Sequence, residues 1–139
     1  MGHEAAAAKL AVEAVLPGIY FESAPQNATA PYKVCRMRSP GRDSQVIAGK
    51  RAMASPLVDV GIWVEWDPCS AVAQAGAKEI DEAMESLRSY RVTDANGDGW
   101  EVSSMREAML LHEEVDTKSG SGKKFYWVGG SYRLSISAV

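Results

Sequence analysis

One stretch, residues 58–66, constrains the fold more than any other part of this sequence. It reads Val-Asp-Val-Gly-Ile-Trp-Val-Glu-Trp, so apolar residues occupy every second position. Successive side chains of a β-strand point to opposite faces, and a period of two therefore predicts a strand with one buried face. We expect this face to consist of Val58, Val60, Ile62, Val64 and Trp66.

The segment after this strand predicts a helix that covers it. Asp67 and Pro68 end the strand, and Asp67 or Ser70 can cap a helix that runs to about Arg88. One side of this helix carries apolar or small residues at helical spacing: Val72, Gly76, Ile80, Ala83, Met84 and Leu87. Its outer face carries the charged residues Lys78, Glu79, Asp81, Glu82 and Glu85. We expect the apolar side to pack on the valine face of the strand.

The remaining segments predict one more helix and three more strands. Residues 4–16 are rich in alanine and end at Pro17-Gly18, which is typical of a helix. Strands are predicted at residues 32–38, 107–116 and 124–137, and a polar tip at residues 117–123 joins the last two. In the last strand we expect a bulge at Gly129 and Gly130.

These elements predict an α+β fold, in which two helices pack on one face of an antiparallel or mixed β-sheet. A chain of 139 residues has the size of one domain, so residues 1–139 are expected to form a single domain. Residues at about 38–57 are predicted to form a polar arm or long loop with weak strand character at residues 45–55. No apolar run is long enough to span a membrane, the N-terminus does not read as a secretory signal, and the cytosol is the expected compartment.

Charge is distributed unevenly, although the net charge is only −3. Residues 33–51 contain one acidic residue and the basic residues Lys33, Arg36, Arg38, Arg42, Lys50 and Arg51. Residues 59–116 contain fourteen acidic residues and four basic ones. We expect the two regions to pair, within one chain or between neighbouring chains. The isoelectric point of about 5.4 argues against nucleic-acid binding as the main activity of the basic segment.

Residues 94–99 match the first half of a calcium-binding loop. Asp94, Asn96 and Asp98 supply oxygen atoms at loop positions one, three and five, and Gly99 occupies position six. Position twelve, which needs a bidentate Glu, is Met105. Asn-Gly and Asp-Gly pairs are also typical of plain tight turns, so we predict a turn without metal.

No residue pattern indicates catalysis or a cofactor. The sequence contains no Gly-x-Ser-x-Gly, Cys-x-x-Cys or His-Glu-x-x-His motif, and residues 117–124 fail to match a phosphate-binding loop at two positions. His112 is expected in a strand beside Glu113 and Glu114. We therefore predict that the protein is not an enzyme, and that it binds no cofactor and no metal.

Two tryptophans are predicted on the sheet face that the helices do not cover. Trp63 alternates with the valines of its strand, and Trp127 alternates with Tyr126 and Val128. Tryptophan is enriched in protein interfaces, which indicates burial against another subunit. The alternative is that the arm at residues 45–55 covers the two indoles within the same chain.

The whole pattern resembles the tail-terminator or tail-completion (head–tail joining) proteins of tailed bacteriophages. The resemblance rests on the N-terminal helix leading into Leu-Pro-Gly-Ile-Tyr at residues 16–20, on Ala-Pro-Gln at 24–26, and on Ala-Pro-Tyr at 30–32 before the first strand. It continues through the polar arm, the alternating strand, the second helix, an acidic strand and a final strand with Tyr-Arg-Leu at 132–134. It covers nearly the whole chain.

This resemblance implies a structural protein of the virion tail or neck, assembled in the cytoplasm of the host bacterium. Copies would form a ring, usually a hexamer in the family, which ends the tail tube, contacts the tube protein and the head connector, and lets DNA pass without reading its sequence. Residues expected at a subunit or partner interface are Arg36, Arg38, Arg42, Lys50, Arg51, Trp63 and Trp127. A head-completion or connector-stopper protein is the alternative in the same class. A small calcium- or ligand-binding module that uses residues 94–99 is the alternative from another class.

Overall fold

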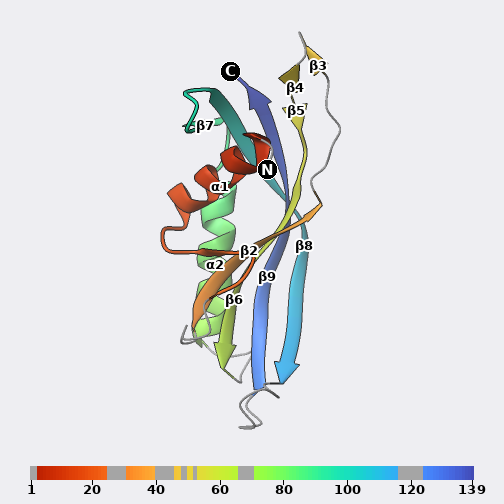
Figure 1. Cartoon of the computed structure of the whole chain (residues 1–139). Helices are drawn as coiled ribbons and strands as arrows, with labels where there is room; N and C mark the ends of the chain where they lie inside the picture. The colour runs from red at the N-terminus through yellow and green to blue at the C-terminus, as the bar shows by residue number, and fades with distance from the viewer. Residues whose placement is uncertain are drawn as a thin grey trace.

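The computed structural model describes residues 3–24, 31–39, 46–47, 50–51, 53–65, 71–115 and 124–139. These parts contain two helices and a set of strands, which Figure 1 labels in chain order. The elements are α1 (His3–Val15), β1 (Tyr20–Phe21), β2 (Tyr32–Ser39), β3 (Val46–Ile47), β4 (Lys50–Arg51), β5 (Met53–Ala54), β6 (Leu57–Glu65), α2 (Ala71–Glu85), β7 (Tyr90–Thr93), β8 (Gly99–Val115) and β9 (Lys124–Ala138).

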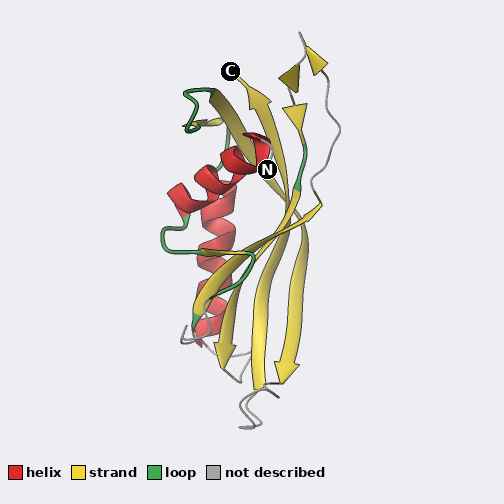
Figure 2. Cartoon of the chain, in the orientation of Figure 1, coloured by secondary structure: helices red, strands yellow, loops and turns green. Residues whose placement is uncertain are grey.

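Seven of the described strands form one mixed sheet with the order β1-β2-β6-β9-β8-β7, and β5 pairs with the end of β9. β1 runs parallel to β2, whereas the other neighbouring strands are antiparallel. β3 and β4 pair with each other in a separate small sheet. Both helices lie on the same face of the main sheet (Figure 2). The predicted α+β fold, a mixed sheet with two helices on one face, is therefore confirmed.

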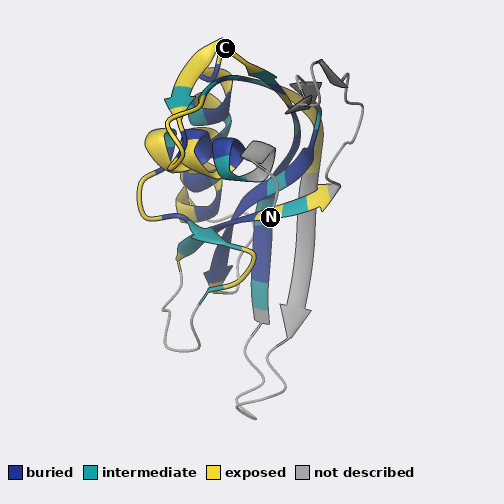
Figure 3. Ribbon diagram, turned by 45° about the horizontal axis from the view of Figure 1, so that its top comes forward, coloured by how far each residue is buried: buried dark blue, intermediate teal, exposed yellow. Residues whose placement is uncertain are grey.

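The alternating stretch forms β6 as far as Glu65, and its valine face lies under the helices as predicted, whereas Trp66 lies outside the described residues. Val58, Val60, Ile62 and Val64 are buried in one apolar cluster, together with Ile80, Met84 and Leu87 from α2 and the residues after it. Figure 3 shows this arrangement, with buried residues along the strands beneath the helices and exposed residues on the outer sides of the helices. Two complementary periods, two in the strand and 3.6 in the helix, thus build the centre of the fold.

α2 approaches β6 closely because a glycine lies at the contact. A Cβ atom added at Gly76 would lie 2.5 Å from Cδ1 of Ile62. The absence of a side chain at Gly76 therefore allows Ile62 to pack directly against the helix backbone.

The predicted boundaries were wrong at the acidic strand. β8 begins at Gly99 instead of residue 107, and the short strands β1 and β7 were not predicted. The first part of β8 pairs with β7 on one side and β9 on the other. Only Trp100 and Val102 are buried there, so the apolar alternation is too short to mark a strand, and tertiary pairing decides the structure.

The bulge predicted at Gly129 and Gly130 was also wrong. β9 keeps a continuous register with β6 through both glycines, and the register shift lies in β8 between Arg106 and Ala108, opposite Tyr132 and Ser131 of β9. The glycines serve another purpose, because a Cβ atom at Gly129 would collide with the backbone of Val60. Gly129 therefore permits close approach of two strand backbones.

The arm predicted at about 38–57 is partly described. β2 extends to Ser39 and β6 begins at Leu57, so regular strands border the arm on both sides. Between them, β5 pairs with β9, and β3 pairs with β4. Residues 40–45, 48–49 and 52 lie outside the described residues.

Candidate functional site

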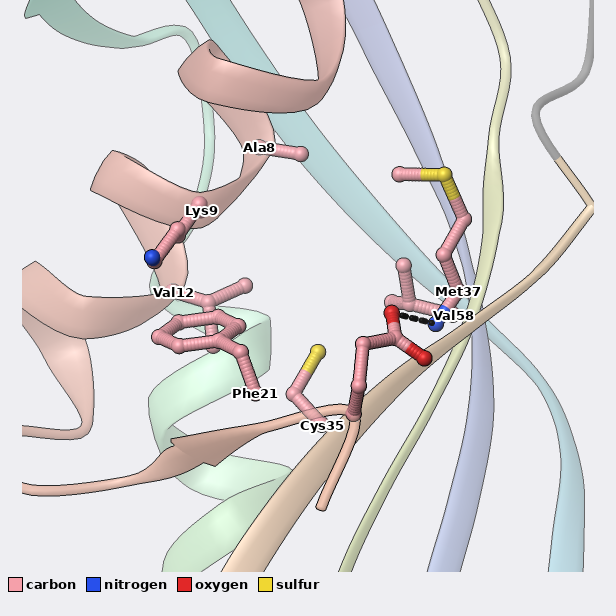
Figure 4. A pocket seen from close by; sticks show the side chains of 8 residues that line it. Ala8, Lys9, Val12, Phe21, Cys35, Met37 and Val58 are labelled. Atoms are coloured by element: carbon pink, nitrogen blue, oxygen red, sulfur yellow. Dashed lines mark hydrogen bonds between the residues drawn. The ribbon is translucent and has the colours of Figure 1, made fainter. Parts of the chain in front are cut away.

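A pocket lies between α1 and the strands at one end of the sheet (Figure 4). Its volume is about 400 Å³, within the usual range for a binding pocket. The lining is mostly apolar and comes from α1, β1 with the residue after it, β2 and β6: Ala8, Lys9, Val12, Phe21, Glu22, Cys35, Met37 and Val58. Such a surface favours an apolar group.

Cys35 directs its sulfur into this pocket but is not an activated nucleophile (Figure 4). Its side chain is buried, and burial raises the pKa of the thiol from 9.0 to about 12, with smaller contributions from the negative charges of Glu22 and Asp59. A thiol with this pKa stays protonated at neutral pH, and the thiolate is the reactive form. Cys35 therefore contributes apolar packing.

Glu22 forms a rigid edge of the pocket. Its backbone adopts a positive φ of 67°, which is uncommon for a residue other than glycine. The backbone N–H of Glu22 donates to the carbonyl of Cys35 (2.8 Å), and its Oε1 accepts a hydrogen bond from the backbone N–H of Met37 (3.2 Å). Nε of Arg36 also donates to the carbonyl of Glu22 (3.0 Å). These bonds extend the end of β1 along β2 and hold the pocket edge in place.

A cation lies at the opposite side of the pocket. The ammonium group of Lys9 is 5.1 Å from the centre of the Phe21 ring, a distance at which a cation is attracted to the face of an aromatic ring. The pocket thus has an apolar lining with a positive and a negative group at its border.

Strand pairing connects this pocket to the far edge of the sheet. Phe21 is paired with Cys35, Cys35 with Val60, Val60 with Gly130, and Gly130 with Met109. Directly paired residues have side chains on the same face of a sheet. Phe21 and Cys35 at one end of this row and Met109 at the other therefore lie at the same level and on the helix-covered face.

The far edge, in the second half of β8, has no neighbouring strand among the described residues. β7 pairs with β8 only as far as Val102, whereas β9 pairs with β8 along its length. Beyond β7, Met105 is 66% exposed and Met109 is 58% exposed. A long edge strand with exposed apolar side chains is a typical site of association.

Arg106 links this edge to α2. Its Nη1 lies 3.2 Å from Oδ1 of Asp81 and donates to the sulfur of Met109 (3.3 Å). Asp81 also accepts a hydrogen bond from the hydroxyl of Tyr132 (3.0 Å), and burial together with this bond raises the pKa of Tyr132. The expectation that Asp81 belongs to the outer, solvated face of the helix was therefore wrong, because Asp81 binds two groups of the sheet.

Trp63 and Trp127, predicted at an interface, lie on the sheet face opposite the helices, where each is only 8% exposed. They form a small cluster with Val34, and the described residues packed against it are Tyr20, Ala24, Tyr32 and Phe125. The indole of Trp127 lies against Gly61, where a Cβ atom would collide with it. The two indoles thus have apolar partners within the chain, from β1, β2 and β9.

The basic residues of the predicted interface are divided between described and undescribed parts. Arg38 forms an ion pair with Asp59 (2.9 Å), and nearby Lys33 forms one with Glu79 (3.4 Å). Part of the basic segment therefore pairs with the acidic region inside the chain, which is one of the two expected arrangements. The backbones of Lys50 and Arg51 lie in β4, whereas their side chains and the whole of Arg42 lie outside the described residues.

The loop with the calcium-like sequence is a turn closed by Asp94. Oδ1 of Asp94 accepts hydrogen bonds from the backbone N–H of Asn96 (2.9 Å) and of Asp98 (3.0 Å). Oδ2 accepts one from Nε1 of Trp100 (3.0 Å), and Asp94 is only 7% exposed. The carboxylate is thus used to organise the turn and to fix a buried indole.

Sequence reasoning did not find the pocket or the exposed methionine that shares its row. Cys35 and Met37 alternate in the predicted strand, which could have indicated a common apolar face. The contribution of Phe21 depends on the parallel pairing of β1, and the level of Met109 depends on the shift in β8. Neither has a signal in the sequence.

Across the described parts of the chain, no group of three or more potential metal-binding side chains is found. Neither of the helices in the described residues is long and apolar enough to cross a bilayer. The sequence matches no protein-family model, and a search of curated proteins finds no significant match.

Proposed function

We propose that the protein is a structural subunit of the virion, and that copies of it form a ring that terminates the tail tube of a bacteriophage and joins it to the head connector. The proposal starts from the resemblance to tail-terminator proteins. The elements on which this resemblance rests occur in the described chain in the expected order, as α1, β2, β6, α2, β8 and β9.

The observation that best supports assembly is the edge of β8 beyond Ser104, whose backbone N–H still donates to the carbonyl of Leu87. No described strand covers it, and it exposes Met105 and Met109. Proteins usually protect long edge strands, because an open edge invites pairing with another chain. An edge that a neighbouring subunit covers in a ring needs no such protection.

The residues most able to serve other functions, a cysteine thiol in the pocket and the first carboxylate of the calcium-like loop, have structural roles. The thiol of Cys35 is buried and protonated at neutral pH. The carboxylate of Asp94, the first residue of the calcium-like loop, accepts three hydrogen bonds from its own turn and from Trp100. These contacts favour a scaffold over an enzyme or a calcium-binding module.

Native mass spectrometry of the full chain tests the ring. Six copies of the 15.0-kDa chain would have a mass of about 90 kDa. Purified rings should then cap tail tubes assembled from the tube protein of the same virus, as seen by electron microscopy. Binding to the head connector without binding to the tube would favour the connector-stopper alternative. A chain that stays monomeric with either partner present would contradict the proposal.

Reversal of charge tests the contribution of the arm. The variant Arg42→Glu, Lys50→Glu, Arg51→Glu should weaken ring formation or docking and make it more sensitive to salt, because neighbouring copies carry an excess of acidic residues. Lys78→Glu, Arg88→Glu, Arg91→Glu is a matched control with the same change in charge at three exposed positions. Equal effects of the two triple variants would show that only net charge matters.

A further inference from the structure

We propose that Met109 of one copy inserts into the pocket beneath α1 of the next copy, so that a knob on β8 and a hole beside β2 form the repeating contact of the ring. This inference rests on the proposed function and identifies the surfaces that would build the ring. Its partner is a second copy of the same chain.

The first argument is the position of the two surfaces along the strands. Met109 and the pocket residues Phe21 and Cys35 are the ends of one row of paired residues. Copies in a closed ring are related by rotation alone, without translation along the axis. If the strands run parallel to the ring axis, residues of the same row stay at the same height. The β8 edge of one sheet then meets the β1 edge of the next sheet, and Met109 lies at the same height as the pocket.

The second argument is the side of the sheet. Met109 is paired with Gly130 and lies on the helix-covered face, and the pocket opens on that face between α1 and β2. Met105, only four residues away, is paired with Arg133 and lies on the opposite face. A neighbouring sheet edge can therefore present Met109, but not Met105, to the pocket.

The third argument is the chemistry of the two surfaces. The pocket has an apolar lining, and the flexible thioether side chain of methionine fits irregular apolar spaces well. Arg106 holds the sulfur of Met109 at 3.3 Å and is itself held by Asp81, so the knob is positioned before contact.

The charges around the two surfaces are complementary. Arg106 lies beside the knob with its side chain 45% exposed, while Glu22 and Lys9 border the pocket. Contact would bring the guanidinium group of Arg106 toward the carboxylate of Glu22. Opposite charges at the border of an apolar contact favour one register over others.

Site-specific photocrosslinking tests the contact directly. Met109 is replaced by p-benzoylphenylalanine in the full chain, and rings are assembled from a mixture of isotope-labelled and unlabelled copies. Irradiation should link position 109 to peptides that contain Phe21 or Cys35 of a different copy. The same replacement at Met105, which is at least as exposed, should not label these peptides.

A second pair of variants guards against effects of the bulky probe. Met109→Asp should raise the dissociation constant of the ring by about 30-fold or more, because it places a charge in a central apolar contact. Met105→Asp should change it less than about threefold. Intact rings that crosslink elsewhere, or equal effects of the two Asp variants, would overturn the inference and leave the proposed function standing. A chain that forms no ring, alone or with tail tubes, would refute both.

Discussion

The hydroxyl of Tyr132 donates a hydrogen bond of 3.0 Å to Oδ1 of Asp81, and this contact joins the centre of the sheet to α2. Tyr132 is only 2% exposed, and Asp81 also contacts Arg106, which precedes the register shift of β8. The helix is thereby held at the level where β8 departs from regular pairing.

The first prediction concerns the hydrogen bond itself. Tyr132→Phe keeps the buried ring and removes the donor, so the free energy of unfolding should fall by about 1.5–3 kcal/mol, the range for a hydrogen bond to a charged group. Tyr90→Phe is the control, since Tyr90 is 37% exposed on β7, and its effect should stay within about 0.5 kcal/mol. Urea denaturation followed by circular dichroism measures both values. Similar losses in the two variants would show that the bond to Asp81 contributes nothing.

The second prediction concerns the contact of β6 with α2. Ile62 is 5% exposed and packs against Gly76, so Ile62→Ala should lower the free energy of unfolding by about 2–5 kcal/mol. Val72 was predicted on the packed side of the same helix, but this was wrong, because Val72 is 53% exposed and Ala73 is buried instead. Val72→Ala should therefore be nearly neutral. A loss within experimental error for Ile62→Ala would mean that the register of β6 is wrong.

The third prediction concerns stability at alkaline pH. The pKa of the Cys35 thiol is raised from 9.0 to about 12 in the folded chain. Between these pH values an unfolded chain loses the thiol proton and the folded chain keeps it, so the free energy of unfolding should fall as pH rises. The slope from this group is at most about 1.4 kcal/mol per pH unit, and it fades within about one unit below pH 9, where the thiol is protonated in both states.

Comparison with Cys35→Ala isolates this effect, because the raised pKa of Tyr132 acts in the same direction in both proteins. Urea denaturation at several pH values from 8 to 11 should give a flatter profile for Cys35→Ala. Parallel profiles would contradict burial of the thiol.

The fourth prediction concerns the turn at residues 94–99. Isothermal titration with calcium should give no binding heat, since Met105 occupies the position of the bidentate ligand and Asp94 already accepts three hydrogen bonds. Asp94→Ala should lower the free energy of unfolding by about 1–3 kcal/mol, because it leaves the buried Trp100 Nε1–H without its acceptor. Asp98→Ala is the control, since Asp98 is exposed and uses its backbone groups in the turn. Binding of calcium lost in both variants would support the calcium alternative.

The parts of the fold that the sequence could predict are those with a local period. β6 and α2 each carry enough apolar residues at regular spacing to define a buried face, and Val60 and Ile80 are fully buried as a result. The first half of β8 has only Trp100 and Val102 as buried positions, so nothing local distinguished it from a turn. Its strand structure depends on pairing with β9, which is distant in the sequence, and with β7, which has only a weak strand signal.

The candidate site shows the same limit more strongly. The alternation of Trp63 with the valines correctly predicted its face, but its cover includes Tyr20 and Tyr32, which reach it through pairing of β1 and β2. The row from Phe21 to Met109 combines four strand pairings. Each pairing depends on packing of the whole chain, so the level of one end relative to the other cannot be read from residue spacing.

The place of β9 in the sheet has a consequence for synthesis of the protein. β9 lies between β6 and β8 and also pairs with β5, yet it follows all other strands in the sequence. While the ribosome is still adding residues 124–138, β6 has one of its two neighbours and the valine face lacks Tyr132, Leu134 and Ile136. The nascent chain must therefore carry an unfinished apolar sheet until translation of β9 is complete, and exposed strands in that state favour aggregation. The sheet is therefore completed only once β9 has been synthesised, and a chain that stops before β9 would lack the strand that joins β6 to β8.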